Sequence, residues 1–545
     1  MSPDQQESEE GPPQPRSNVT RAASVIGMAV LASRVLGLVR EQVFAAFFGA
    51  GAVFDAFVTA FRIPNLFRDL LAEGALSAAF VKVFSQTLDR EGEKRAWRLA
   101  SVVFTVLAAL VSLLVLAGIL AAPWIVHAMA PGFDEGQKIL ATRLTRVMFP
   151  FLLLVSLAAV VMGVLNSTNR FGIPALAGAF FNVGSLVFGL LAAALMEPEY
   201  MLGTARAAFA GESFQGGADA AAGAILGMAI GVLAGGALQL LLQTPSLHRT
   251  GFRFRPGFDL KDPGLRQVFR LMGPAVIGTA AVQVNVFVNN NFASRLEHGA
   301  VSWLSYAFRF MQFPIGIFGV AIATATLPAI ARAIARKDEK NYRETLSSSL
   351  RLALFLTLPS AAGLIVLGRP IVGLIYERGN FLPADTEQTA AALTCFAVGL
   401  VGYALVKILA PAFYAVDDPK TPARISLFSI LLNLLLCTVL VGPLGHRGLA
   451  LSTASVATLN ALALWLLLRR RVGSLGEAAL LGALIRIGLA TVALWFTCRY
   501  ALAFLEGWLP GTSLGPRLVH VFGAISMGGG VYLLVHRLLP NIRTR

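Results

Sequence analysis

Charged side chains are scarce in this chain of 545 residues. Asp, Glu, Lys and Arg make up only 14% of it, whereas a soluble domain carries about 25%. Hydrophobic residues reach 56%, and the mean hydropathy is +0.69. Polar side chains are too few to cover the surface of a water-soluble protein of this size. We therefore expect most of the chain to face lipid or other apolar helices.

Histidine and cysteine are also rare, and neither forms a pattern that supports chemistry. The six histidines are scattered, without metal-ligand spacing. Cys395, Cys437 and Cys498 lie inside apolar segments and are expected to be small core residues. No glycine-rich loop ends in Gly-Lys-Ser/Thr, so ATP hydrolysis by this chain is excluded. The sequence predicts no enzyme activity, cofactor or metal site, and transport must be driven by the membrane potential, an ion gradient or the substrate gradient.

The formal net charge of +15 raises the question of nucleic-acid binding. In membrane proteins, however, Lys and Arg gather in cytoplasmic loops. The sequence holds no soluble basic domain that could grip a duplex. We therefore predict no nucleic-acid partner.

Apolar windows of roughly 20 residues recur along nearly the whole chain, and each is long enough to cross a hydrocarbon core of about 30 Å. They predict an all-α polytopic membrane protein with about fourteen transmembrane helices. The windows lie at residues 22–49, 56–88, 97–122, 138–166, 173–195, 220–243, 269–293, 302–332, 344–367, 386–415, 422–441, 446–469, 478–503 and 515–538. Residues 1–21, rich in Pro, Gln, Glu and Ser, are expected to be a disordered cytoplasmic tail.

The basic residues of the predicted loops all fall on one side of the membrane. Arg and Lys cluster after the second, sixth, eighth and twelfth windows, for example at residues 90–98 and 469–471. The loop after the fifth window instead sets Arg206 against several acidic residues. Because positively charged loops stay in the cytoplasm, this alternation predicts that both termini are cytoplasmic.

The chain contains an internal repeat. Residues 51–62 read GAVFDAFVTAFR and residues 299–309 read GAVSWLSYAFR, which places Arg62 and Arg309 at an offset of 247. An even number of helices in each copy makes the two copies parallel. We therefore predict two lobes of six helices each. The predicted divisions are a first lobe at 22–243, a cytoplasmic inter-lobe loop at 244–268, a second lobe at 269–470, and two extra helices with a short cytoplasmic tail at 471–545.

Ionisable side chains at membrane depth cost at least about 2.5–3.5 kcal/mol each, so they mark functional sites by default. The cations are Arg34, Arg40, Arg62, Arg68, Arg309 and Lys407, and the acids are Glu41, Asp55 and Glu73. This excess of cations predicts a cavity that attracts anions. Guanidinium groups suit phosphate oxygens because they form paired hydrogen bonds with them.

Structural roles are the alternative for several of these residues. Arg40 beside Glu41, and Arg68 beside Asp69, can form ion pairs that only stabilise the fold. Asp55 can cap the start of the second helix.

The spacing of the arginines constrains the helices that carry them. Arg34 and Arg40 are separated by about 240° around a straight helix, and Arg62 and Arg68 have the same spacing. A straight lipid-facing helix cannot hide both members of such a pair. We therefore expect bent or broken helices beside water. Arg309 has no adjacent acid, and it can either bind substrate or pin a helix interface.

Several stretches resemble one family of membrane proteins. They are SRVLGLVRE at 33–41, FGAGAVFDAFVTAFRIPNLFRDLLAEGALSAAFV at 48–81, VLNSTNRFGIPA from Val164, and VSWLSYAFRFMQFPIGIFGVAIATATLP from Val301. The sequence resembles the MurJ (MviN) family of lipid II flippases, within the multidrug/oligosaccharidyl-lipid/polysaccharide exporter superfamily.

The resemblance implies a flippase of the bacterial cytoplasmic membrane. It would move lipid II, the undecaprenyl-pyrophosphate-linked peptidoglycan precursor, from the cytoplasmic to the periplasmic leaflet by alternating access through a cationic central cavity. Membrane lipids and cell-wall synthesis proteins are the further partners implied. Arginines needed for activity in the family map to Arg34, Arg40, Arg68 and Arg309, Asp55 and Glu73 match family acids, and Arg62 fills a position that can be Lys.

The sequence departs from the family at some positions. Glu41 stands where Asp is common. Some relatives bind sodium in the second lobe through acids, but this chain has Gln283, Asn285 and Asn433 in those helices, so we predict no such site. Two other functions stay open: a flippase for another polyprenyl-linked oligosaccharide, and a non-transporting membrane scaffold for cell-wall synthesis.

Overall fold

The computed structural model describes residues 16–70, 76–214 and 216–540. Within these ranges every regular element is a helix and no strand occurs, which confirms the predicted all-α fold. The first helix begins at Arg16, so the last residues of the predicted disordered tail are helical. Glu73, one of the predicted site residues, lies outside the described residues.

The helices of the first half of the chain vary widely in length. They are α1 (Arg16–Phe48), α2 (Ala52–Arg68), α3 (Ser77–Glu91), α4 (Glu93–Met129), α5 (Glu135–Met148), α6 (Phe151–Ser167), α7 (Gly172–Met196), α8 (Pro198–Ala210), α9 (Ala218–Leu241) and α10 (Thr244–His248). Those of the second half are α11 (Pro263–Ala293), α12 (Ala300–Pro314), the π-helical turn η2 (Ile315–Gly319), α13 (Val320–Ala335), α14 (Glu339–Tyr376), α15 (Pro383–Val398), α16 (Leu400–Ala415), α17 (Lys420–Leu444), α18 (His446–Val472), α19 (Glu477–Trp508) and α20 (Leu514–Leu538).

Ten helices or continuous helix pairs among the described residues are long and apolar enough to cross a membrane. The pair α15 and α16, which bends by 43°, raises this number to eleven. These candidates coincide with predicted windows. The other three windows, at 22–49, 56–88 and 269–293, coincide with α1, with α2 and α3, and with α11. These helices carry the charged and amide side chains described below, and the exact count of fourteen spans is not confirmed.

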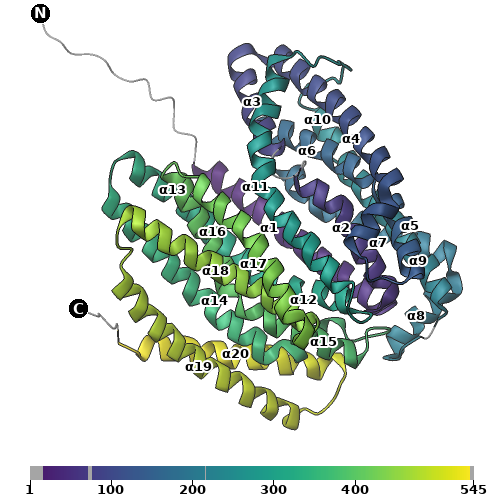
Figure 1. Ribbon diagram of the computed structural model, residues 1–545, viewed down its shortest axis with the longest axis vertical. Helices are drawn as coiled ribbons and strands as arrows, with labels where there is room; N and C mark the ends of the chain where they lie inside the picture. Colours follow the sequence, from purple (N-terminus) through teal and green to yellow (C-terminus); the bar gives the residue numbers. More distant parts are fainter. Residues whose placement is uncertain (1–15, 71–75, 215, 541–545) are drawn as a thin grey trace, which may run out of the picture.

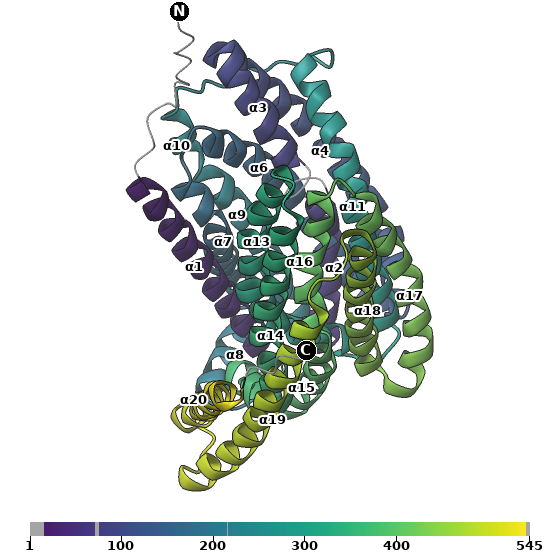
Figure 2. The same ribbon diagram turned by 90° about the vertical axis from the view of Figure 1, so that its left-hand side faces the viewer.

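The helices form two bundles that lie side by side (Figure 1). Helices α2 to α10 make up one bundle, and α12 to α18 make up the other. Helix α1 packs mainly on α7 and is therefore counted with the first bundle, while α11 contacts α3 and α4 on one side and α17 on the other. Helices α19 and α20 pack against each other and against α14, at the outer edge of the second bundle (Figures 1 and 2).

The connections between helices define two ends of the molecule. The end that we call the Gly49 end has the turns at 49–51, 130–134, 294–299 and 377–382. The opposite end, called the basic end, has the turns at 168–171, 249–262, 336–338 and 416–419. The long turn at 249–262 contains Arg249, Arg253, Arg255 and Lys261.

The two bundles touch closely at the Gly49 end. The backbone N–H of Asn380 donates to the carbonyl of Ala46 at 2.9 Å. Gly49 and Gly379 both have positive φ, at 63° and 59°. A Cβ on Gly49 would lie 2.3 Å from the carbonyl oxygen of Asn380, and one on Gly379 would lie 2.4 Å from that of Ala46. Only glycine fits this approach of two backbones.

An ion pair at the basic end ties the start of the second half to the first. The carboxylate of Asp262 caps α11, accepts hydrogen bonds from the amides of Gly264 and Leu265, and pairs with Arg95 of α4 at 2.9 Å. Burial alone would raise the pKa of Asp262. The hydrogen bonds from Arg95 and the two amides outweigh it, and the pKa is lowered.

Candidate functional site

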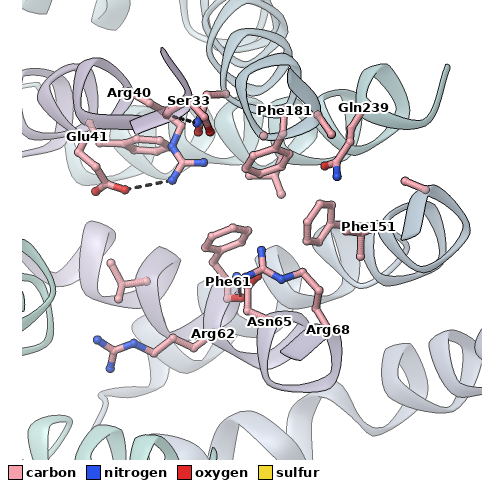
Figure 3. A pocket seen from close by; sticks show the side chains of 18 of the residues that line it. Ser33, Arg40, Glu41, Phe61, Arg62, Asn65, Arg68, Phe151, Phe181 and Gln239 are labelled. Atoms are coloured by element: carbon pink, nitrogen blue, oxygen red, sulfur yellow. Dashed lines mark hydrogen bonds and ion pairs between the residues drawn. The ribbon is translucent and has the colours of Figure 1, made fainter. Parts of the chain in front are cut away.

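A cavity of about 630 Å³ is lined mainly by the first bundle and α1, and Ser305 and Arg309 of α12 line it from the second bundle. Side chains of α1, α2, α6, α7, α9 and α12 line it. Its charged lining residues are Arg40, Glu41, Arg62, Arg68 and Arg309. Four guanidinium groups therefore share the cavity with one carboxylate. Figure 3 shows Arg40 and Arg68 reaching toward it from opposite sides.

The cavity extends between the two ends of the molecule. Pro174 near the start of α7 and Gln239 near the end of α9 line it, and these helix ends belong to the basic end. Toward the Gly49 end the lining stops at Phe44, four residues before the end of α1, and at Phe54, two residues after the start of α2.

Glu41 joins two arginines from different bundles. Its Oε1 atom lies 3.0 Å from Nη2 of Arg40 on the same helix and 3.1 Å from Nη2 of Arg309 on α12. Arg40 and Glu41 are 7% and 8% exposed, while the side chain of Arg309 is 42% exposed. The ion pair between neighbours suggested by the sequence is therefore present, and it extends across the bundles to Arg309.

Aromatic rings hold the Arg40 guanidinium in place. Its central carbon lies 5.9 Å from the centre of the Phe61 ring and 5.4 Å from that of Phe181. Phe151 packs on both rings, with centroid separations of 6.2 and 5.3 Å (Figure 3). A cation between two ring faces is stabilised by their electron density, and it keeps one orientation toward the cavity.

Arg62 is oriented from α11. Its Nη1 donates to the side-chain oxygen of Asn290 at 2.7 Å. Asn290 is fully buried, and its amide nitrogen donates to the hydroxyl of Thr59 and the carbonyl of Met129. An amide that also donates to the first bundle thus fixes the position of a cavity arginine.

Arg68 belongs to a second chain of contacts between the bundles. Its guanidinium pairs with Asp69 at 3.1 Å, as the sequence alternative suggested. The other oxygen of Asp69 accepts a hydrogen bond from Gln283 of α11 at 3.2 Å. The side chain of Arg68 is 24% exposed. This arginine is therefore held by Asp69 and remains partly exposed.

Asp55 lies away from the cavity and caps a helix of the other bundle. Its carboxylate accepts hydrogen bonds from the backbone N–H of Gly299 at 2.7 Å and of Ser302 at 2.8 Å, and from the Ser302 hydroxyl. Gly299 is the N-cap residue of α12, whose first amides have no partner within the helix. The alternative that Asp55 caps its own helix is wrong, because Gly51 is the N-cap of α2 and receives no side-chain hydrogen bond.

The remaining predicted site residues are placed differently. The guanidinium of Arg34 lies against Gly316 in η2, because a Cβ there would be 2.3 Å from both of its terminal nitrogens. Arg34 thus contacts the other bundle, but it is not among the cavity-lining residues. Lys407 on α16 is exposed and does not line the cavity.

Several cavity residues were not singled out from the sequence. They include the polar residues Ser33, Asn65, Asn182 and Gln239 and the aromatic residues Phe61, Phe151 and Phe181. Asn182 also donates to the carbonyl of Ser33 at 3.0 Å, which links α7 to α1. A search for amide side chains within apolar windows would have found Asn65, Asn182 and Gln239. No pattern distinguishes the aromatic residues from others that face lipid.

The second bundle has a polar network that involves α11, α17 and α18. Asn433 donates to Asn289 at 3.0 Å, and Asn289 donates to Thr453 at 3.1 Å. Ser452 donates to the side-chain oxygen of Asn433 at 3.1 Å. Among the described residues, no group of three His, Cys, Asp or Glu side chains could hold a metal ion.

The fold and the cavity together define a class of protein. Two helical bundles that both line a charged cavity are an architecture suited to a membrane transporter, and a solved transporter shares the fold. A structure described as an inward-facing multidrug resistance MATE family transporter of the MOP superfamily matches with a TM-score of 0.61, covering 84% of this chain and 96% of that one at 15% identity. This likeness concerns the fold alone.

The family follows from closer matches. The sequence matches the family described as lipid II flippase MurJ over residues 44–515. The lipid II flippase MurJ of Burkholderia cenocepacia is 37% identical over 461 residues, covering 83% of this chain and 84% of that protein. The probable lipid II flippase MurJ of Vibrio cholerae is 32% identical, covering 95% and 96%. The chain belongs to the MurJ family.

A solved structure of the same description agrees with this assignment. Lipid II flippase MurJ in an inward closed conformation matches with a TM-score of 0.74 and 25% identity, covering 94% of this chain and 97% of that one. The protein is thus a multi-pass membrane protein of the inner membrane, and its named relatives are flippases rather than enzymes.

Proposed function

We propose that this protein is a flippase that moves lipid II from the cytoplasmic to the periplasmic leaflet. Its basic end would lie in the cytoplasm, because loops rich in Arg and Lys stay on that side. The Gly49 end would then be periplasmic. In this orientation the bundles are joined at the periplasm and the cavity reaches helix ends on the cytoplasmic side, which we interpret as an inward-facing state of an alternating-access cycle.

The convergence of four arginines from both bundles on one cavity carries the proposal. Arg40, Arg62 and Arg68 come from the first bundle and Arg309 from the second, and only Glu41 opposes them among the charged lining residues. A diphosphate carries negative charge and several acceptor oxygens, and guanidinium groups bind such oxygens through paired hydrogen bonds. A carrier of organic cations would need the opposite sign.

Substrate binding would replace an existing contact. Glu41 now holds Arg40 and Arg309 through a single oxygen atom. Diphosphate oxygens would compete with Glu41 for both guanidinium groups and bridge the two bundles directly. Only binding that differs between states can shift an equilibrium between them. A head group that contacts both bundles satisfies this condition, whereas one held by the first bundle alone does not.

Return to the empty state needs an energy source outside the chain. The membrane potential supplies about 2.3 kcal/mol per elementary charge per 100 mV. It favours movement of an anionic head group outward and of unoccupied arginines inward. An ion gradient is the alternative driving force. Cell-wall synthesis proteins that consume the precursor outside are the expected protein partners.

Reconstituted transport tests the proposal. Vesicles that contain the purified protein should move fluorescent lipid II between leaflets, and Arg40→Ala and Arg309→Ala should abolish the movement. Lys407→Ala is the matched control, since it also removes a cation but one that does not line the cavity. Transport by both arginine variants at the rate of the parent would contradict the proposal.

Substrate choice separates the alternatives. A flippase for another polyprenyl-linked oligosaccharide should prefer that lipid to lipid II in the same vesicles. A scaffold should move neither. In cells, depletion of the protein should leave the lipid-linked precursor in the cytoplasmic leaflet.

A further inference from the structure

A second cavity lies at the basic end, outside the cavity discussed so far. It has a volume of about 550 Å³ and is formed by the start of α14 and the segment that joins α18 to α19. The two cavities share no lining residue. An inference about this site therefore does not depend on what the first cavity carries.

One face of α14 supplies the charge. Lys340, Arg343, Ser347 and Arg351 follow each other at intervals of three or four residues, so their side chains lie along one side of the helix. Glu344 is the acidic member of the lining. Three cations against one acid leave the cavity with a net positive charge.

Nearby acids do not neutralise these cations fully. The guanidinium of Arg351 donates to the carbonyl of Ser347 and the hydroxyl of Ser348, and it has no acidic partner in the part of the chain that is described. Arg343 pairs with Glu339 at 3.4 Å, but the Glu339 side chain is 77% exposed. An exposed ion pair of this kind contributes little, so Arg343 is available to another anion.

Two glycines of the segment that joins α18 to α19 lie close to this face of α14. Gly473 and Gly476 have φ values of 83° and 77°. A Cβ on Gly473 would lie 3.2 Å from Nη1 of Arg343, and one on Gly476 would lie 3.5 Å from the hydroxyl of Ser347. The joining segment therefore lies directly against the cationic face of α14.

The cavity sits where the helices change from polar to apolar. Helix α14 is 38 residues long, or about 57 Å, so part of it must project beyond a hydrocarbon core of about 30 Å. Its polar stretch ends at Arg351, and an apolar stretch begins at Leu352, which is 48% exposed. On α19 the first exposed large hydrophobic residue is Leu481, which is 53% exposed. A phosphate at Arg351 could thus be followed by acyl chains over Leu352 and Leu481.

We propose that this cavity binds the phosphate head group of an anionic phospholipid of the cytoplasmic leaflet. Basic pockets between transmembrane helices on the cytoplasmic side suit such head groups. The guanidinium groups of Arg343 and Arg351 hold the phosphate oxygens, and Lys340 adds positive charge at the rim. The lipid links α14 to α19 and so fastens the last two helices to the second bundle.

Thermal unfolding in defined vesicles tests the site. The protein is reconstituted into phosphatidylcholine alone and into an equal mixture of phosphatidylcholine and phosphatidylglycerol. The parent should unfold at a higher temperature in the mixture, and the double variant Arg343→Ala/Arg351→Ala should lose most of this increase. Removing two cations should weaken phosphatidylglycerol binding roughly tenfold or more. Arg332→Ala/Arg336→Ala, which removes two exposed cations of the same end outside the cavity, is the control and should respond like the parent.

Two further measurements can refute the proposal. Inorganic phosphate added to phosphatidylcholine vesicles should not reproduce the increase in unfolding temperature. An equal increase would mean that the site binds a free anion and not a lipid, and it would overturn the proposal. An undiminished response of the double variant would also overturn it. If the double variant does not fold, the single variant Arg351→Gln in the same vesicles should show a smaller loss of the response, and an unchanged response there refutes the site.

Discussion

The hydrogen bonds of Asp55 should hold the proposed inward-facing state, and their loss should open the Gly49 end. The carboxylate is 2% exposed and accepts from two backbone amides of the other bundle. Asp55→Ala leaves the amides of Gly299 and Ser302 buried without an acceptor, which costs about 1–3 kcal/mol for each of them. Because the variant also avoids burying a carboxylate, we take the lower end, about 2 kcal/mol. This change shifts the balance toward the outward-facing state by roughly thirtyfold.

A distance measurement between spin labels can detect this shift. In a variant without Cys395, Cys437 and Cys498, labels are placed at Arg206 of α8 and Glu387 of α15, which are exposed on different bundles. The parent should show one short distance. Asp55→Ala should add a longer one that accounts for a measurable fraction of the molecules.

The control removes an equivalent cap that does not cross between the bundles. Asp134 accepts from the backbone N–H of Gln137 at 2.8 Å and caps α5 within the first bundle. Asp134→Ala should lower stability by about 1 kcal/mol, as the loss of a helix cap does, and leave the distance unchanged. Identical distance distributions for the parent and Asp55→Ala would refute the reasoning, and so would equal changes in the two variants.

Three further predictions concern other parts of the molecule. Arg309→Lys should restore little of the transport lost in Arg309→Ala, since a single ammonium cannot form the paired hydrogen bonds of a guanidinium; equal rates for Lys and Arg in the vesicle assay would exclude paired recognition. A cysteine placed between residues 89 and 98 should resist an impermeant thiol reagent in intact cells, whereas one placed between 200 and 210 should react, and the reverse pattern would invert the proposed orientation. Asp262→Asn should lower the unfolding temperature at neutral pH. Because the pKa of Asp262 is lowered in the folded state, its contribution to folding stability is complete above the unfolded-state pKa and disappears as the pH falls through the folded-state pKa. A difference between the variant and the parent that persists in acid would contradict the ion pair with Arg95.

Hydropathy predicted the helices well because it is a local property. Each apolar window coincides with a helix or a helix pair, since a segment in lipid must satisfy its backbone hydrogen bonds internally. The count is weakest at α1, α2, α3 and α11, where polar side chains that serve the site lower the hydropathy. The signal that identified the candidate site is therefore the one that made its helices hard to recognise.

The partners of the site residues were beyond the reach of the sequence. A charge inside a span predicts that some partner exists, but Asp55 finds Ser302 and Glu41 finds Arg309 across more than 240 positions of the chain. Such pairings depend on how whole bundles pack. Lys407 shows that a charge within an apolar window need not face the cavity, because the helices packed around α16 decide which side of it is exposed.

The contact between Asp55 and Ser302 bears on how the chain came to have two halves. These residues are 247 positions apart, the offset that also relates Arg62 to Arg309. In a dimer of identical single repeats, a residue close to the twofold axis meets its own copy. Two aspartates there would repel each other, whereas an aspartate can face a serine once the copies are fused into one chain and have diverged. The contact between Asp55 and Ser302 thus breaks the symmetry between the two halves of the chain.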